Sequence, residues 1–484
     1  MRILLIVHRY LGVAVGLVMT LWCLSGFVMM YRGFPAVTAA QRLAGLKPLD
    51  LAHIAPALDI GSGPIDGFRI EMLADRPVLK LAGPEGRRML DLATGAPIKG
   101  VGSAEAAAVA TRFAAGGGVS ADGVETRQID QDQWTVEGAG SRGPVYRVGF
   151  PDSRRSVVYV AERTGEVVQA TDRSSRLWAW LGAVPHWLYP HVLRRNGQVW
   201  AQVVIWTSLT GVFLTATGLY VGIARFRRAR NGRWSPYSGW YWWHHLAGLF
   251  FGLFTLTWVA SGLLTMNPWG LLESSAGETA QAAVAGEVQS AEARAFIDAA
   301  RRLPSGAVTL EAAPLNGRLF VLERFRDGRV VRLDDQARPA PLGREELAVA
   351  LMAAGLPAAR LELISHPDAY YYPNYDGPAP LPAWRAQIAG RGGKTAYLDP
   401  ISGRVRLALD GEARASRWIR VGLHDLDFPG LRARPVWDVV VILLLAGVTV
   451  GVGAGAWLSL RRVGLDLGRL KMRLSRGTAR ARPY

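Results

Sequence analysis

Four long apolar segments alternate with two long polar ones along this chain of 484 residues. The apolar segments cover residues 1–31, 199–226, 242–267 and 435–460. Each reaches the roughly 20 residues that a helix needs to cross the hydrocarbon core of a bilayer. The polar segments, 32–198 and 268–434, are each long enough to fold as a domain. The pattern therefore predicts four transmembrane helices, with a large domain outside the membrane after the first and after the third.

Short apolar runs that end in turn residues recur inside the polar segments. The runs at 157–160 and 395–398 each lead into a glycine-containing turn and a second apolar run, which predicts two β-hairpins. The alanine-rich stretches 104–115 and 344–354 are typical of helices. Each polar segment is therefore expected to be a domain of mixed α and β structure.

The two halves of the chain repeat one another. The first and third apolar segments share the pattern H-x3-G-x3-G-x5-W-x2-S-G, displaced by 236 residues. Its paired members are His8 and His244, Gly12 and Gly248, Gly16 and Gly252, Trp22 and Trp258, Ser25 and Ser261, and Gly26 and Gly262. The match continues through Asp132 and Asp368, Tyr159 and Tyr397, His186 and His424, and Trp200 and Trp437. Two copies of one topology predict a pseudo-twofold axis along the membrane normal.

The net charge of +17 is concentrated in two short segments. The loop 227–241 and its approach carry Arg225, Arg227, Arg228, Arg230 and Arg233. The tail 461–484 carries Arg461, Arg462, Arg469, Lys471, Arg473, Arg476, Arg480 and Arg482. Short basic segments next to a span stay in the cytoplasm. We therefore expect a protein of the bacterial inner membrane, with both termini and the middle loop in the cytoplasm and both large domains in the periplasm. We interpret the tail as a segment that sets the topology and lies on anionic membrane lipid, and we expect no nucleic-acid partner.

Several other classes of function are excluded by the residues. The single cysteine, Cys23, lies in the first span and rules out disulfides and Cys-ligated iron–sulfur clusters within one chain. The first span could be a signal peptide, but its apolar run is long and the repeat makes it a permanent helix. The run Gly451-x-Gly453-x-Gly455 lies in an apolar span with no strand before it, so it is not a dinucleotide motif. No Walker loop, HExxH motif or nucleophile–base arrangement is present.

The positions of four histidines indicate which kind of cofactor the chain could bind. His8 and His244 lie near the cytoplasmic ends of spans one and three, and His186 and His424 lie just outside spans two and four. Ionisable residues near the membrane tend to face a bundle interior, and the expected symmetry would bring each pair face to face. Two facing imidazoles are the axial ligands that a six-coordinate haem needs. The glycines at intervals of four residues would leave room for the macrocycle, although such glycines also serve close helix packing.

The remaining histidines leave alternatives open. His191 and His245 lie beside the ligand candidates, where each could be a cofactor ligand or a hydrogen-bonding neighbour. His53 and His366 lie in the outer domains and are expected to be ordinary surface or structural residues. No CxxCH motif is present, so any haem is expected to be non-covalent haem b. We predict two of them, with His8, His244, His186 and His424 as the ligands of the haem iron.

The chain resembles the PepSY-associated transmembrane family. The resemblance rests on His8-Arg-Tyr-Leu-Gly and His244-His-Leu-Ala-Gly, on the Ser-Gly pairs that end both helices, and on 159–165 and 397–403, which look like PepSY-type modules. Asp399-Pro400 fits the family's acidic turn, whereas the first copy has Ala161-Glu162. The resemblance implies a four-helix transmembrane bundle of two tandem pseudo-twofold repeats, each with a PepSY-like α+β periplasmic domain inserted between its helices.

The same resemblance implies a function, because the family includes haem-containing ferric-siderophore reductases. By that similarity His8 and His244 would hold an inner haem, and His424 with either His186 or His191 an outer one. The cytoplasmic segments are too short to bind a nicotinamide or flavin, so a membrane quinol or a separate reductase is the expected electron donor. The acceptor would be a ferric siderophore or another ferric chelate.

Two rival hypotheses remain. One is a membrane-anchored PepSY sensor or protease-regulatory module without redox activity. The other is a transporter of the chelate or of iron. The scarcity of acidic residues in the four spans counts against a cation path, although Asp438 near the start of span four keeps that hypothesis open.

Overall fold

The computed structural model describes residues 2–55, 58–118, 123–226, 235–304, 306–373, 379–390 and 392–480. It divides into two compact units. The membrane unit comprises Met1–Phe34, Leu177–Leu272 and Ser416–Tyr484, and the extramembrane unit comprises Pro35–Arg176 and Glu273–Ala415. Of the basic cluster predicted to set topology, Arg227, Arg228, Arg230, Arg233 and Arg482 lie outside the described residues.

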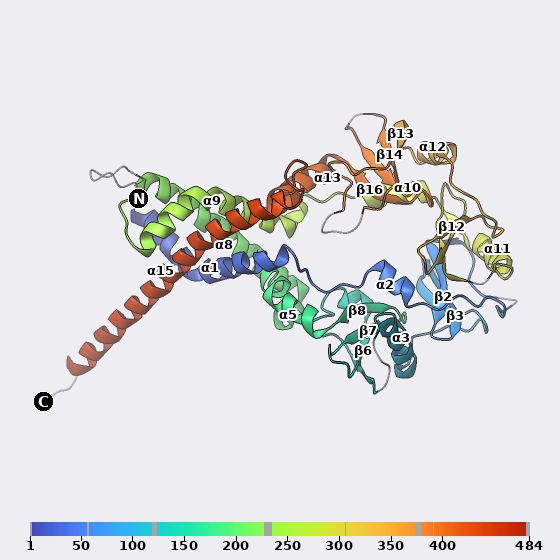
Figure 1. Cartoon of the computed structure of the whole chain (residues 1–484), viewed down its shortest axis with the longest axis horizontal. Helices are drawn as coiled ribbons and strands as arrows, with labels where there is room; N and C mark the ends of the chain where they lie inside the picture. The colour runs from blue at the N-terminus through green and yellow to red at the C-terminus, as the bar shows by residue number, and fades with distance from the viewer. Residues whose placement is uncertain are drawn as a thin grey trace. The chain divides into compact units, whose positions relative to one another are not determined.

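The membrane unit is built on four helices that are long and apolar enough to cross a membrane. They are α1 (Arg2–Met29), α8 (Gly197–Arg225), α9 (Trp240–Thr265) and α15 (Val436–Arg480). The protein is therefore a membrane protein with four candidate spans. The helices lie side by side in the order α1, α8, α9, α15 and back to α1, so α1 and α9 occupy opposite corners of the bundle (Figure 1).

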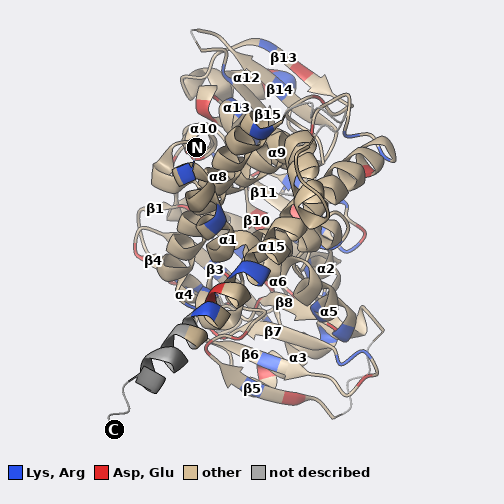
Figure 2. Ribbon diagram, turned by 90° about the vertical axis from the view of Figure 1, so that its left-hand side faces the viewer, with Lys and Arg blue, Asp and Glu red and all other residues tan. Residues whose placement is uncertain are grey.

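Several hydroxyl groups of the spans form hydrogen bonds within their own helix, as a lipid environment favours. Hydroxyl groups donate to the carbonyl one turn earlier, as in Thr20 to Gly16 and Thr449 to Leu445. At the start of α8 the Asn196 side chain accepts a hydrogen bond from the Val199 amide at 3.0 Å, which caps the helix. Most of the length of the four helices carries no charged side chain. The blue of Lys and Arg and the red of Asp and Glu appear on α15 towards its C-terminal part (Figure 2).

Short helices connect the spans to the extramembrane unit. They are α5 (Arg173–Leu181), α6 (Ala183–His186) and α7 (His191–Arg194) before α8, and α13 (Gly411–Ser416), a π-helical turn (Arg417–Gly422) and α14 (Leu423–Asp425) before α15. A 3-10 turn, Pro268–Gly270, follows α9. Helix α6 packs on α1 and α14 packs on α9. The two predicted outer histidines are thereby brought back onto the bundle.

Two four-stranded antiparallel sheets in the extramembrane unit have the same meander order. The first is β5 (Glu125–Ile129), β6 (Val145–Gly149), β7 (Val157–Ala161) and β8 (Val167–Thr171), with α3 (Ser103–Ala115) packed against it. The second is β13 (Ala358–Ile364), β14 (Ala383–Ile388), β15 (Thr395–Leu398) and β16 (Val405–Leu409), contacted by α12 (Arg344–Ala353) and α10 (Ala276–Ala285). The predicted hairpins β7–β8 and β15–β16 and the helices α3 and α12 are confirmed.

A third sheet is shared by both halves of the chain. Its six strands run in the order β12 (Val330–Leu333), β11 (Val321–Phe325), β10 (Ala307–Ala312), β2 (Gly67–Leu73), β3 (Arg76–Gly83) and β4 (Gly86–Asp91). The two halves meet where β10 pairs with β2, with Leu310 opposite Ile70. Helix α11 (Ser290–Ala300) contributes Phe296 and Ile297 to the core on one face of this sheet. The two polar segments, expected to fold separately, are therefore joined through one sheet.

Smaller elements complete the extramembrane unit. They are α2 (Ala39–Ala44), α4 (Ala139–Arg142) and the two-stranded pair β1 (Pro64–Ile65) with β9 (Val288–Gln289). The pair β1–β9 also joins the two halves of the chain. Arg301 provides a further link between segments distant in sequence, because its Nη2 donates to the Ala55 carbonyl at 2.8 Å.

Candidate functional site

The inner histidine pair lies between opposite corners of the bundle. His8 on α1 and His244 on α9 face each other with ring centroids 6.0 Å apart. His8 Nδ1 lies 3.1 Å from the Leu214 carbonyl of α8, and His244 Nδ1 lies 2.8 Å from the Gly451 carbonyl of α15. A carbonyl only accepts, so each Nδ1 carries the hydrogen and the neutral ring keeps its free lone pair on Nε2. No described residue bonds either Nε2.

Two glycines make room for these rings. A Cβ atom added at Gly218 of α8 would lie 2.6 Å from His8 Cε1, and one added at Gly455 of α15 would lie 2.7 Å from His244 Cε1. Both distances are well inside the ~3.5–4.0 Å at which carbon atoms pack. The run Gly451-x-Gly453-x-Gly455 therefore supplies both a carbonyl and a space for His244. Gly218 and Gly455 were not predicted as site residues, although their displacement of 237 residues follows the repeat.

The glycines that the pattern did single out have other neighbours. A Cβ at Gly16 would meet Ala456 of α15 at 3.5 Å, and one at Gly252 would meet the Leu219 side chain at 2.6 Å. These positions serve close helix packing, which was the alternative reading. A Cβ at Gly248 would meet no described atom within 4 Å.

The outer histidine pair repeats one set of contacts twice. His186 and His424 have ring centroids 6.4 Å apart. His186 Nδ1 lies 3.1 Å from Ser25 Oγ and 3.2 Å from the Trp22 carbonyl of α1. His424 Nδ1 lies 3.1 Å from Ser261 Oγ and 3.3 Å from the Trp258 carbonyl of α9. The ring opposite His424 is thus His186, and again no described residue bonds Nε2.

Two tryptophans hold the segments that carry the outer pair. Trp200 Nε1 on α8 donates to the Trp187 carbonyl at 2.9 Å, directly after His186. Trp437 Nε1 on α15 donates to the Asp425 carbonyl at 2.7 Å, directly after His424. The sequence matched these tryptophans as a pair without indicating their contacts. Each fixes the backbone beside a histidine to the start of the following span.

A second pair of tryptophans has a different property. The indole Nε1 atoms of Trp22 and Trp258 are buried and have no hydrogen-bond partner among the described residues. A buried donor without an acceptor is costly. These two donors lie at the level of the outer histidines, because the carbonyls of the same residues contact His186 and His424.

The two histidine pairs lie at different depths of the bundle. His8 and Trp22 are on the same helix, and its rise of ~1.5 Å per residue puts the inner and outer levels roughly 20 Å apart. The same spacing separates His244 from Trp258 on α9. The pairs are thus separated by about two thirds of the ~30 Å hydrocarbon thickness.

The other candidate positions have different surroundings. His245 has Nδ1 2.8 Å from Ser235 Oγ and Nε2 3.0 Å from the Gly222 carbonyl, so both ring nitrogens are engaged and neither can coordinate iron. His191 begins α7, and His186 takes the place opposite His424. His53 and His366 are exposed in the extramembrane unit. Asp438 is paired with Arg434 at 2.5 Å and accepts from the Tyr31 hydroxyl at 3.0 Å.

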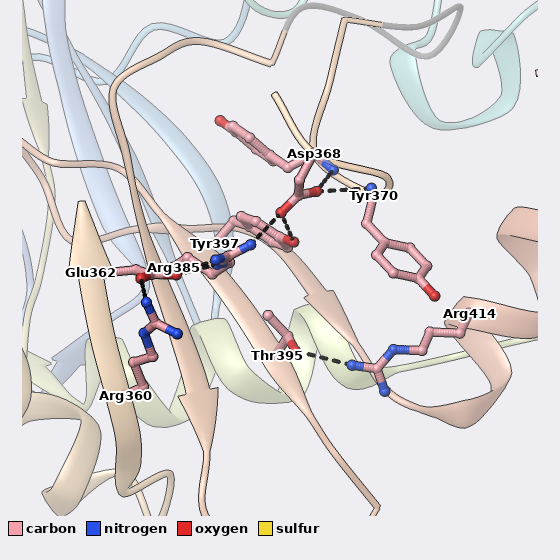
Figure 3. A network of polar contacts seen from close by, with 9 residues as sticks. Arg360, Glu362, Asp368, Tyr370, Arg385, Thr395, Tyr397 and Arg414 are labelled. Atoms are coloured by element: carbon pink, nitrogen blue, oxygen red, sulfur yellow. Dashed lines mark hydrogen bonds and ion pairs between the residues drawn. The ribbon is translucent and has the colours of Figure 1, made fainter. Parts of the chain in front are cut away.

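A polar network fixes the aromatic loop at 366–372 (Figure 3). Asp368 accepts from the Tyr397 hydroxyl at 2.7 Å and from the Tyr370 amide at 2.9 Å, and it pairs with Arg385 at 3.0 Å. Burial pushes the pKa of Asp368 upward, but hydrogen bonds from the Tyr371 amide, the Tyr397 hydroxyl and Arg385 hold it below its usual value. Tyr371 stacks on Tyr397 at 4.8 Å and is almost fully buried. Tyr371 therefore packs the domain core.

The first half of the chain contains an equivalent arrangement. Asp132 accepts from the Tyr159 hydroxyl at 2.7 Å and from the Trp134 amide at 2.9 Å. An ionic link between the four-stranded sheet and the shared sheet is also present in each half, with the signs of the charges exchanged. Lys80 bridges Glu71 and Glu166, and Glu311 bridges Arg324 and Arg404. These contacts join each four-stranded sheet to the shared sheet, so the networks have a structural role.

Within the described residues, no group of three or more His, Cys, Asp and Glu side chains could hold a metal ion. No curated protein matches this chain. The PepSY-associated TM region family matches residues 5–462. That match overlaps all four candidate spans and includes both histidine pairs, and the chain belongs to the PepSY-associated TM region family.

Proposed function

We propose that the membrane unit binds two haem b groups and carries electrons across a bacterial inner membrane to a ferric chelate. The observation that carries this proposal is the spacing of the two histidine pairs, 6.0 Å and 6.4 Å between ring centroids. An iron bound between two imidazoles needs about 2 Å for each metal–nitrogen bond, and each ring nitrogen lies roughly 1.1 Å from its ring centre, so the ring centres come to lie roughly 6 to 6.5 Å apart. Both pairs fit that requirement.

The remaining atoms of the pairs also fit a haem. Each Nδ1 is held by a backbone carbonyl, which is the usual support of a metal-bound histidine and leaves Nε2 for the iron. Two imidazoles alone hold a metal weakly, and a porphyrin supplies the other four nitrogens. The buried indole N–H groups of Trp22 and Trp258 are donors for an acceptor group on a bound cofactor. When bound, the haem would supply one-electron redox chemistry.

The chain's own residues do the positioning. Leu214, Gly451, Trp22 and Trp258 orient the four rings through their carbonyls. The placement of the pairs at two depths suits a path from one membrane face to the other. We therefore assign His8, His244, His186 and His424 as the iron ligands, with no ligand role for His191 or His245.

A ferric chelate is the acceptor we propose, in line with the haem-containing reductases that the sequence resembles. One electron converts one iron(III) to iron(II). The lower charge weakens the bond of the metal to hard oxygen ligands, so the chelate releases it. The proposed donor is a membrane quinol or a separate reductase.

The basic residues support one orientation of the bundle. Arg2 and Arg9 lie in the first turns of α1, Arg225 ends α8, and Arg461 and Arg462 follow the apolar part of α15. All of these mark the ends of the helices that lie away from the outer histidine pair. By the positive-inside rule these ends face the cytoplasm, so both termini are cytoplasmic and the extramembrane unit is periplasmic.

We further propose that the chain consists of two tandem copies of one unit, each with an extramembrane segment inserted between its two helices. The paired contacts support this proposal. The outer histidines each contact a serine and a tryptophan carbonyl, the inner ones each lie beside a glycine, and the two aspartates each bind a tyrosine hydroxyl. The corner positions of α1 and α9 are those of helices related by a twofold axis.

Reduction of iron by the haem-loaded chain in proteoliposomes tests the proposal. The vesicles would hold a quinol donor, with iron(III) citrate or an iron(III) trihydroxamate outside and ferrozine to trap iron(II). We expect iron(II) to form with the wild-type chain and not with His8→Ala or His424→Ala. His53→Ala is the matched control, since His53 is exposed and outside the bundle, and it should reduce iron at the wild-type rate. Equal rates in all variants would overturn the assignment in favour of a sensor or a regulatory module.

A transporter remains the other rival. Asp438 is paired with Arg434 and Tyr31, which makes it a poor ligand for a passing cation. Radioactive iron added outside the vesicles distinguishes the two, because a reductase leaves the iron outside while a transporter moves it across the bilayer.

A further inference from the structure

One row of residues crosses the whole shared sheet. Its six members, paired strand by strand, are Val331, Glu323, Leu310, Ile70, Leu79 and Leu90. Five are apolar and belong to the core on that face or pack against it. Glu323 is the exception, and its side chain lies on the same face, between Val321 and Phe325 of that core.

Glu323 has an unusual environment for a carboxyl group. The residue is only 5% exposed, and its Oε1 atom is buried without a hydrogen-bond partner among the described residues. Burial raises the pKa of Glu323, and the nearby Arg329 opposes this effect. A buried carboxyl without a partner lowers the stability of the fold.

Folding does not require an acid at this position. The sheet is symmetric about the β10–β2 pair, and the residue that occupies the place of Glu323 in the other half is Leu79. Leu79 is fully buried in the same core. An apolar side chain therefore satisfies this sheet position, and the carboxyl group of Glu323 needs another explanation.

Glu323 is among the residues that line a cavity of about 290 Å³ in the extramembrane unit. The walls are largely apolar and include Leu49, Leu51, Leu303 and Leu310. Asp50 also lines the cavity, but it is exposed and its Oδ1 accepts from the Ala52 amide at 3.2 Å. The volume is near the lower end of the ~300–1,000 Å³ typical of small-molecule sites, so the occupant is small.

Of the described residues that line this cavity, Arg301 is the one cation. Its Nη2 donates to the Ala55 carbonyl at 2.8 Å and lies 3.4 Å from Asp298. Its Nε is buried and has no partner in the part of the chain that the structure describes. No ion pair within 4 Å joins Arg301 to Glu323 among those residues. Two residues that line the cavity thus carry one donor and one acceptor without a hydrogen-bond partner among the described residues.

We propose that this cavity binds a small zwitterion with an ammonium group, a carboxylate and an apolar body, as in an apolar α-amino acid. The ammonium group pairs with Glu323, the carboxylate accepts from Arg301, and the apolar body lies against the leucines. The site uses none of the histidines of the bundle, so it stands or falls separately from the proposed redox function.

Calorimetric titration of the detergent-solubilised full chain tests the proposal with three matched probes. Leucine carries both charged groups, isoamylamine lacks the carboxylate, and 4-methylpentanoate lacks the ammonium group. We expect leucine to bind with a dissociation constant below about 1 mM and each of the other two at least ~10-fold more weakly, since each leaves one charged side chain unpaired. Absence of binding of leucine at about 10 mM would overturn the proposal, as would equal binding of all three probes.

Two variants separate the site from the fold. Glu323→Leu reproduces the Leu79 environment, so we expect the ligand-free chain to melt a few degrees higher while the heat of leucine binding is lost. Arg301→Gln should weaken leucine binding at least ~10-fold. Arg302→Gln is the control, because the adjacent Arg302 is exposed and does not line the cavity. Unchanged leucine binding in Glu323→Leu, with the fold intact, would contradict the proposed ammonium contact.

Discussion

Substitution of Gly455 by alanine tests the packing of the inner histidine pair. The added Cβ would lie 2.7 Å from His244 Cε1, against a preferred separation of ~3.5–4.0 Å, so the ring must move by roughly 1 Å. Overpacking of this kind costs about 1–3 kcal/mol. Movement of the ring also weakens the 2.8 Å hydrogen bond from Nδ1 to Gly451, a loss of about 1 kcal/mol.

The gain in helix propensity acts in the opposite direction. Alanine is favoured over glycine in a helix interior by about 1 kcal/mol, which leaves a net destabilisation of about 1–3 kcal/mol for Gly455→Ala. Gly248→Ala is the matched control in the same bundle, because a Cβ there meets no described atom within 4 Å. The control should therefore be neutral or stabilised by up to ~1 kcal/mol. The two substitutions differ in sign although the chemical change is identical.

Thermal unfolding in detergent, followed by tryptophan fluorescence, measures this difference. We expect Gly455→Ala to melt below the wild-type chain and Gly248→Ala at or above it. Haem titration provides a second readout, in which Gly455→Ala should retain one haem, at the outer site, while the wild-type chain retains two. Equal melting temperatures for the two variants, with the wild-type haem content in Gly455→Ala, would refute the claim that Gly455 makes room for His244.

Three further substitutions test other contacts. Asp368 has a pKa below its usual value in the folded chain. Its interactions therefore stabilise the fold above the unfolded pKa of ~3.9, and this stabilisation is lost as the pH falls through the pKa of the folded state. Tyr397→Phe should cost about 1–2 kcal/mol at pH 7 and move acid unfolding to higher pH. Lys80→Met leaves the buried Glu71 with fewer partners and should destabilise the chain by about 3 kcal/mol in chemical denaturation. Trp437→Phe removes the 2.7 Å bond to the Asp425 carbonyl and should lower haem retention at the outer site while leaving the inner site loaded.

Each of these has its own control. In an Asp368→Asn background, Tyr397→Phe should no longer change the pH dependence; a persisting change would assign the effect elsewhere. Arg87→Met alters an exposed cation near Lys80 in the shared sheet and should cost little. Trp243→Phe changes an exposed tryptophan of α9 and should leave haem retention unchanged. Equal effects in a variant and its control would contradict the contact in question.

The sequence was sufficient for much of the membrane unit because lipid imposes strong rules. Spans must be long, apolar and helical, and the ends of α1 and α9 lie within a few residues of the apolar segments that predict them. Repetition of the pattern around His8 and His244 indicated which histidines belong together. Their contact partners on α8 and α15 could not be predicted, because helix rotation depends on packing and not on hydropathy.

The shared sheet could not be predicted from either half alone. A repeat indicates that two segments adopt the same local structure, but it carries no information on whether their edge strands pair with each other. The pairing of Leu310 with Ile70 joins residues about 240 positions apart, and its register depends on both strands. For the same reason, the place of Glu323 in an otherwise apolar row is visible only when six strands are aligned.

The central claim is that the bundle holds two haems between two pairs of histidines. The most direct measurement is the visible absorption spectrum of the purified chain before and after dithionite, with haem quantified per chain, for the wild type, His244→Ala and His186→Ala. The account predicts two low-spin haems in the wild type, with sharp α and β bands on reduction, and the loss of a different haem in each variant. A colourless chain from haem-replete cells, or variants with the full wild-type haem content, would contradict it.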